Sequence, residues 1–216
     1  VKTNVDTTSK LQAVVDSYNL ILAEANGSAT DSTSADPVAS DYTRIGVNLA
    51  NNLLTGSASS NGIALLNDVV GLQATTGVDT PTKIEALASV ISRILVTAAG
   101  GTASPALTPA DFSSIGVNGI NNSNLNVILN GIAGTSDDGN EIASLNSLQG
   151  VVNAGATQAV ALNQISTFAD NNVGTSSAPT PTASTYAAAV VALPSVTGLT
   201  SEQVASAINS ALTTSN

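Results

Sequence analysis

The chain repeats itself, and an internal repeat constrains the fold more than any other property of a sequence. The segment 41–48 returns at 111–118, and the segment 5–11 returns at 78–84. The segment 61–67 returns at 140–146. A further set returns at the same offset as this last pair: Val117, Gly119, Ile120, Leu125, Leu129 and Asn130 match Val196, Gly198, Leu199, Val204, Ile208 and Asn209. Offsets of 70 to 79 between copies indicate a tandem array, an architecture typical of scaffolds, spacers and binding surfaces.

Composition narrows the classes of partner. Charged residues make up only 9 % of the 216-residue chain, and the net charge is −10. Five cations cannot form the basic patch that nucleic acid requires, so we expect no nucleic-acid partner. No apolar stretch approaches the roughly 18 residues of a membrane helix, so we expect no membrane insertion. Aromatics are 2 %, and the core must therefore be filled by Val, Leu, Ile and Ala.

The chain has no His and no Cys, which removes Ser-His-Asp and Cys-His catalysis, common zinc sites and disulfides. No phosphate-binding glycine loop occurs, and no spacing pairs two carboxylates for acid–base work. We therefore expect no enzyme activity and no cofactor. Met is absent even at position 1, which suggests a processed product or a fragment of a longer chain.

Apolar residues fall at helical spacing along most of the chain. A helix is expected from residue 5 to about 25, with Thr7 or Thr8 as N-cap, and its repeat after Thr80-Pro81. Further helices are predicted at 40–47, 48–54, 62–73, 111–117, 124–133, 141–152, 156–169, 185–191 and 201–212. The helix 185–191 could continue towards Pro194, and Val160, Leu162, Ile165 and Phe168 are the expected buried positions of 156–169. Short strands are the competing interpretation, but alternation is poor, so the prediction is an all-α array of short helices.

The repeats divide the chain into four parts. Residues 1–36 are the closing helix of a preceding unit and a linker, 37–103 and 104–179 are repeat units, and 180–216 is a partial third unit. The first part is a closing helix without its preceding helices, and the last part is an opening half-unit without its closing helices, so each supplies what the other lacks. The residues expected at these assembly ends are Leu11, Val14, Tyr18 and Leu22 at one end, and Val204, Ile208 and Leu212 at the other. The ends could close on each other within one chain or meet head to tail between chains.

Candidate ligand sites are few. Asp137, Asp138, Asn140 and Glu141 surround Gly139 and form the best calcium candidate, although they do not match an EF-hand loop. A solvated turn that caps a helix starting at Glu141 is the favoured alternative. Asp41 and Asp111 are expected to cap helices rather than bind a ligand. The aromatics that follow them, Tyr42 and Phe112, and the later Tyr186 are expected in the core rather than as a stacking platform. Asn51-Asn52 and Asn121-Asn122 could bind sugars, but turns are the commoner use of such pairs.

The segments 108–120, 124–126 and 5–16 resemble the repeats of very large bacterial surface proteins and secreted adhesins. The resemblance covers nearly the whole chain and implies no catalytic residue. It implies an extracellular or cell-surface location and a structural role as a spacer or assembly module in adhesion, biofilm or surface architecture. The implied partners are the chain itself or neighbouring repeats, and surface glycans. A self-assembling subunit of a filament or surface layer is the alternative, and a carbohydrate-binding or enzyme domain is a third.

Overall fold

The computed structural model describes residues 6–29, 35–49, 58–170, 179–190 and 200–214. Over these residues the chain is all-α, as predicted, with nine α-helices, two single 3₁₀ turns and no β-strand. The helices are α1 (Thr8–Glu24), α2 (Ala39–Arg44), α3 (Ala58–Leu72), α4 (Pro81–Ala98), α5 (Pro109–Ser114), α6 (Leu125–Ala133), α7 (Leu145–Asp170), α8 (Ala183–Ala189) and α9 (Ser201–Thr214). The 3₁₀ turns are η2 (Thr75–Gly77) and η3 (Asn140–Ile142).

Local capping explains where the helices begin. The Thr7 side chain accepts the amide of Lys10 at 3.2 Å at the start of α1, and Thr80 accepts the amide of Lys83 at 3.4 Å at the start of α4. Pro81 occupies the first turn of α4, where its missing N–H costs nothing. At α9, Thr200 and Gln203 exchange hydrogen bonds in a capping box. These starts were all predicted from the sequence.

The glycine of each Ile-Gly-Val sequence indicates where the first two short helices stop, and the structure agrees for both, whereas the third helix ends differently. Gly46 and Gly116 follow α2 and α5 with φ of 98° and 85°, a conformation that favours glycine. The prediction that the helix at 185–191 could continue towards Pro194 is wrong. α8 ends at Ala189, because Val190 adopts an extended conformation (φ −128°, ψ 155°) that cannot propagate a helix.

The predicted pair of helices at 141–152 and 156–169 is one helix, α7, which has 26 residues. Glu141 does not start it but lies in the 3₁₀ turn η3. The helix passes through Gly155 without a break. A glycine fits this position because α6 approaches closely: an added Cβ would lie 2.9 Å from Cγ1 of Ile128. The predicted buried face is also shifted, since Val160 and Leu162 are 61 % and 41 % exposed, whereas Ala161 is buried. Ile165 and Phe168 are half-buried. Of the predicted helix at 48–54, all but two residues lie outside the described part.

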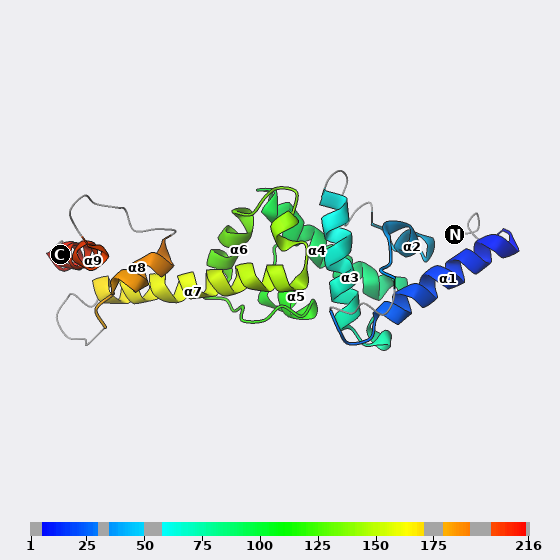
Figure 1. The fold of residues 1–216 in the computed structure, drawn as a ribbon, viewed down its shortest axis with the longest axis horizontal. Coiled ribbons are helices and arrows are strands. Elements are labelled where there is room, and N and C mark those ends of the chain that lie inside the picture. The colour runs from blue at the N-terminus through cyan, green and yellow to red at the C-terminus, as the bar shows by residue number, and fades with distance from the viewer. Residues whose placement is uncertain (1–5, 30–34, 50–57, 171–178, 191–199, 215–216) are drawn as a thin grey trace.

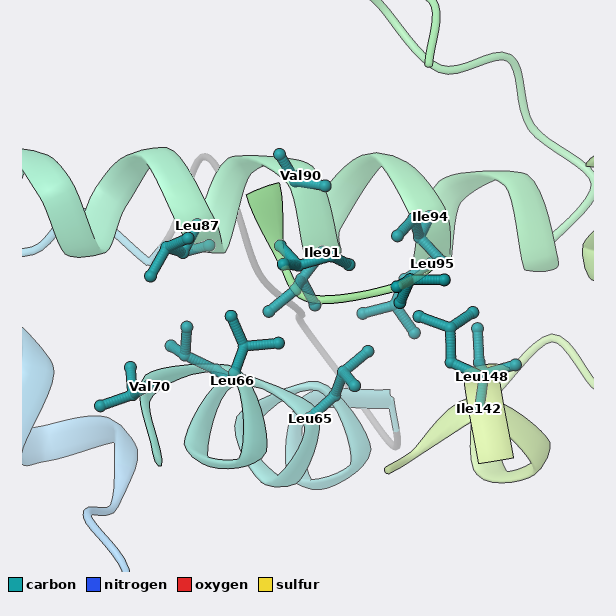
Figure 2. Close-up of a cluster of buried hydrophobic side chains, with 14 of the residues drawn as sticks. Leu65, Leu66, Val70, Leu87, Val90, Ile91, Ile94, Leu95, Ile142 and Leu148 are labelled. Carbon is teal, nitrogen blue, oxygen red and sulfur yellow. The ribbon is translucent and has the colours of Figure 1, made fainter. Parts of the chain in front are cut away.

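The helices follow one another along an elongated molecule (Figure 1), with α1 at one end and α9 at the other. A single apolar core extends from α1 to the first half of α7. Figure 2 shows its centre, where α4 lies over α3 and side chains of both helices meet: Leu87, Ile91 and Leu95 from α4, and Leu65, Leu66 and Val70 from α3. A second, small cluster lies at the far end and comprises Ala183, Tyr186 and Ala205, with Ile165 and Ile208 packed against it.

Candidate functional site

The acidic loop before α7 uses its oxygens internally. Oδ1 of Asp138 accepts the backbone amide of Asn140 at 3.0 Å, and Oε2 of Glu141 accepts the amide of Ser136 at 2.7 Å. The amide of Asn140 and then the Ser136 hydroxyl hold the pKa of Asp138 below its ordinary value. The backbone carbonyl of Asp138 accepts Nδ2 of Asn61 at 2.8 Å, which ties the loop to α3. Asp137 and Asn140 are exposed. The loop is thus organised as a turn that joins two elements.

Metal ligation has little geometric support in this loop. Within the part of the chain that the structure describes, no three His, Cys, Asp or Glu side chains gather closely enough to hold an ion. Calcium prefers six to eight oxygen ligands, and a turn whose carboxylates already accept amide hydrogens offers few free ones. Calcium binding by Asp137, Asp138, Asn140 and Glu141 therefore stays a prediction from sequence.

The carboxylate of Asp111 connects α5 to α4. Its Oδ2 accepts the amide and the hydroxyl of Thr108 at 2.8 and 2.7 Å, so it caps α5 as predicted. Its Oδ1 receives Nη2 of Arg93 at 2.5 Å, and Nη1 of Arg93 also faces the carbonyls of Pro105 and Ala106 at 3.5 and 3.4 Å. The bond from Arg93 is the main reason that the pKa of Asp111 falls to about 2. This ion pair, which the sequence did not predict, fastens the segment before α5 onto α4.

Asp41 connects α2 to α1 in a comparable way. Its Oδ2 accepts the amide of Val38 at 2.9 Å, again as a cap. Its Oδ1 accepts the hydroxyl of Ser17 on α1 at 2.8 Å and Nη1 of Arg44 at 3.2 Å. Both acidic residues therefore serve helix packing, which confirms the capping interpretation.

The recurring aromatics are buried, as predicted, and each of the two tyrosines takes part in a hydrogen-bonded chain of its own. The hydroxyl of Tyr42 donates to Oδ1 of Asn67 at 2.6 Å, and Nδ2 of Asn67 donates to the carbonyl of Pro37 at 2.9 Å. We call this Tyr–Asn–Pro arrangement the tyrosine clamp. It ties a short helix, the segment before it and the following helix into one piece. Burial raises the pKa of Tyr42 far above its ordinary value.

A second tyrosine clamp lies near the far end. The hydroxyl of Tyr186 donates to Oδ1 of Asn209 at 2.5 Å, and Nδ2 of Asn209 donates to the carbonyl of Pro181 at 2.8 Å. Phe112, the aromatic of α5, is fully buried but has no hydroxyl. The sequence matched Asn130 with Asn209 but paired Asn67 with Asn146, so it did not indicate that Asn67 and Asn209 have the same role.

The predicted assembly ends lie far apart. Leu11 on α1 is 52 % exposed, whereas Val14, Tyr18 and Leu22 are half-buried. The Tyr18 hydroxyl donates to the carbonyl of Asp79 at 2.8 Å. On α9, Val204 is buried, and Ile208 and Leu212 are half-buried. Figure 1 places α1 and α9 at opposite ends of the molecule, so the two ends do not close on each other within one chain.

The second asparagine pair lies beside a groove of mixed polar and apolar lining. Oδ1 of Asn121 accepts the amides of Ser123 and Asn124 at 2.9 and 3.2 Å, which makes this pair a turn before α6, as the commoner interpretation predicted. A groove of about 480 Å³ runs from this turn to α7 and is lined by amide and hydroxyl side chains among small apolar ones. Asn51 and Asn52 lie outside the described residues.

Across the described ranges, no helix is both long and apolar enough to span a bilayer. The strongly perturbed carboxylate, Asp111, is engaged in an ion pair with Arg93 that joins α5 to α4. The features with the most elaborate geometry therefore connect helices to one another. Neither a protein-family model, nor a curated protein, nor a solved structure matches this chain.

Proposed function

We propose that this chain is a structural module, a spacer or assembly unit, of an extracellular bacterial surface protein, and that it has no enzyme activity. The observation that carries the proposal is the recurrence of the tyrosine clamp, with the same three residue types in the same roles around α2–α3 and α8–α9. A connection used twice to fasten consecutive helices is what a copied building unit requires.

The order of helix lengths supports a tandem organisation. Long helices (α1, α4 and α7, of 17, 18 and 26 residues) are each followed by a short one (α2, α5 and α8, of 6, 6 and 7 residues). A middle helix then follows (α3, α6 and α9, of 15, 9 and 14 residues). We propose that the unit is long–short–middle, with copies at 8–72, 81–133 and 145–214.

The proposed units begin at a different helix from the sequence units 37–103 and 104–179, but both divisions pair α2 with α5, α3 with α6 and α4 with α7. The match between 61–67 and 140–146 conflicts with this pairing, because it aligns a stretch of α3 with η3 and the first residues of α7. In the proposed register, Val78 before α4 corresponds to Ile142 before α7, and both are fully buried. Like positions then occupy like elements, which is the condition that a repeat must meet.

The surface chemistry is consistent with an extracellular spacer. Charged side chains are rare and predominantly acidic, and uncharged Ser, Thr and Asn supply most of the polar surface. Contacts between neighbouring helices, supplemented by clamps and ion pairs, let an array grow without a change in cross-section. The resemblance of 108–120 to adhesin repeats supports a cell-surface location. The amide-lined groove beside Asn121 offers hydrogen bonds that a surface glycan could use.

The proposal predicts that the length of the molecule increases in proportion to the number of joined copies. Small-angle X-ray scattering on one chain and on a genetic fusion of two copies, joined directly, should give a maximum dimension that roughly doubles, with a nearly constant cross-section. A two-copy protein whose cross-section grows instead would refute the spacer function. Binding of the single chain to a glycan array, abolished by substitution of Asn121 or Asn163, would favour the carbohydrate-binding alternative.

A filament or surface-layer subunit is the second candidate. The observation that favours it is the exposure of apolar side chains on α1, at the end of the elongated molecule. Spacer and subunit differ in whether units are joined by peptide bonds or by contact alone, and light scattering on the isolated chain distinguishes the two.

A further inference from the structure

The helices α1 and α4 correspond position by position along their sequences. Thr7 and Thr80 cap them in the same manner. Lys10 pairs with Asp6, and Lys83 pairs with Asp79, both at 2.7 Å. Farther along, Ile21 and Ile94 are both fully buried. The correspondence therefore allows the surroundings of the two helices to be compared residue by residue.

The comparison reveals a stripe of exposed apolar side chains on α1. Leu11 and Val15 are 52 % and 42 % exposed, whereas their counterparts on α4, Ile84 and Ala88, are fully buried. In the register that aligns Val78 with Ile142, the corresponding positions on α7 are Leu148 and Val152, and both are fully buried too. α4 packs along α3, and α7 packs along α6, so in each case a preceding middle helix packs against the long helix. Among the described residues, no helix covers Leu11 and Val15 of α1 in this way.

Helix α9 also has a face that is less buried than the corresponding face of its counterpart, α3. The two tyrosine clamps align Asn67 of α3 with Asn209 of α9. The residues of α3 on either side of Asn67 that are fully buried against the core are Leu65, Leu66, Val69 and Val70. Their counterparts on α9 are Ala207 and Ala211, which are exposed, and Ile208 and Leu212, which are half-buried. The face that α3 presents to its neighbours is thus incompletely covered on α9.

We propose that the Leu11–Val15 stripe of α1 binds the Ala207–Ala211 face of α9 of a second copy of this chain, head to tail. The inference rests on the proposed repeat unit, because the contact would continue the α3–α4 and α6–α7 interfaces from one chain to the next. Figure 1 shows α1 and α9 at opposite ends of the molecule, so the two helices cannot contact each other within one chain. Such a contact is heterologous and generates an open filament unless its rotation closes a ring.

The chemistry of the two faces fits. Leu11 and Val15 are branched side chains that project from α1, whereas Ala207 and Ala211 are small and leave room on α9. Close approach of a large and a small residue is already seen where Gly155 of α7 meets Ile128 of α6. Because alanine buries little area, the association is expected to be weak and to depend on concentration.

Two blocking variants of the full chain test the contact. One carries Leu11→Asp and Val15→Asp, and the other carries Ala207→Asp and Ala211→Asp. All four positions are exposed or nearly half-exposed, so both variants should keep the helicity and thermal midpoint of the parent chain. A third variant, Val160→Asp with Leu162→Asp, adds the same charge to exposed positions of α7 and serves as the matched control.

Sedimentation velocity over a hundredfold range of concentration should show the mass of the parent chain and of the control rising together. Each blocking variant alone should stay monomeric. Their mixture should form a dimer and nothing larger, since one partner keeps its α9 face and the other keeps its α1 stripe.

A parent chain that is monomeric throughout would overturn the inference, as would association that survives either pair of substitutions or is lost equally in the control. None of these results bears on the doubling of length in the two-copy fusion, in which a peptide bond joins the copies. A monomeric parent with additive length would leave the spacer proposal intact, whereas non-additive length with head-to-tail association would leave only the contact.

Discussion

Replacing Asp111 by Asn tests whether the ion pair between α4 and α5 stabilises the fold. The side chains of Arg93 and Asp111 are only 12 % and 20 % exposed, and their atoms approach to 2.5 Å. A pKa lowered from 3.8 to about 2 corresponds to about 2 kcal/mol of preference for the charged form. Because part of the carboxylate reaches solvent, we expect Asp111→Asn to lower the free energy of unfolding at pH 7 by about 1–2 kcal/mol.

The pH dependence has a definite sign. The folded-state pKa of Asp111 is depressed, so its contribution is complete above the unfolded-state pKa near 3.8 and is lost as pH falls towards 2. The carboxyl of Asp68 contributes to the pH dependence of stability with the opposite sign, because burial raises its pKa. This contribution is the same in parent and variant, so it cancels in the difference between their free energies of unfolding. The difference between parent and variant should therefore shrink from about 1–2 kcal/mol at pH 7 to near zero at pH 2.

Urea unfolding followed by circular dichroism at pH 7, 5, 3 and 2 measures this difference. Asp79→Asn is the matched control, because the Asp79–Lys83 pair is 2.7 Å long but about half exposed on both sides. It should cost less than about 0.5 kcal/mol at every pH. A difference between Asp111→Asn and parent that does not change with pH would refute the reasoning.

Three further substitutions probe the packing. Tyr42→Phe removes the hydroxyl that donates to Oδ1 of buried Asn67 and should lower the free energy of unfolding, measured with urea, by about 1–3 kcal/mol. Tyr186 is more exposed, so Tyr186→Phe should lower it by less. Equal, negligible losses in the two variants would contradict a stabilising clamp. Ile115→Asp places a carboxylate at a fully buried position and should cost about 3–5 kcal/mol, so an unchanged thermal midpoint would be incompatible with this core. Gly155→Ala should destabilise by about 1–3 kcal/mol because its Cβ would meet Ile128, whereas Gly150→Ala, with open space around it, should be neutral or stabilising by thermal unfolding.

Helix starts could be predicted from sequence because capping is local. Thr7, Thr80 and Thr200 each bond to an amide in the first turn of the helix that follows, so a short stretch of sequence contains the whole interaction. The stops at Gly46 and Gly116 are equally local, since a positive φ favours glycine. Ile84 and Ile94 fall at helical spacing on one face of α4, and both are fully buried.

The errors arose where a distant segment decides the structure. The sequence predicted two helices separated at 153–155, but Gly155 lies inside one helix, α7, where the side chain of Ile128 on α6 occupies the space of a Cβ. Ala161 is buried in place of Val160 because this half of α7 packs against α8, on a different side of the helix from Leu148. The ion pair of Arg93 with Asp111 and the clamp of Tyr42 with Asn67 each join two different helices, so neither separation along the chain is fixed by helical periodicity.

The scarcity of aromatics explains why polar connections recur in this fold. A core of Val, Leu, Ile and Ala buries less area per side chain than one with aromatics, so apolar packing alone leaves each short helix weakly held. The short helices α2, α5 and α8 have only 6 or 7 residues, too few to be stable in isolation. Each of them is fastened by a directional contact to a neighbouring helix: Asp41 to Ser17, Asp111 to Arg93, and Tyr186 to Asn209. In a sequence with so few charges, the placement of those charges and of a few asparagines therefore determines how successive helices are joined.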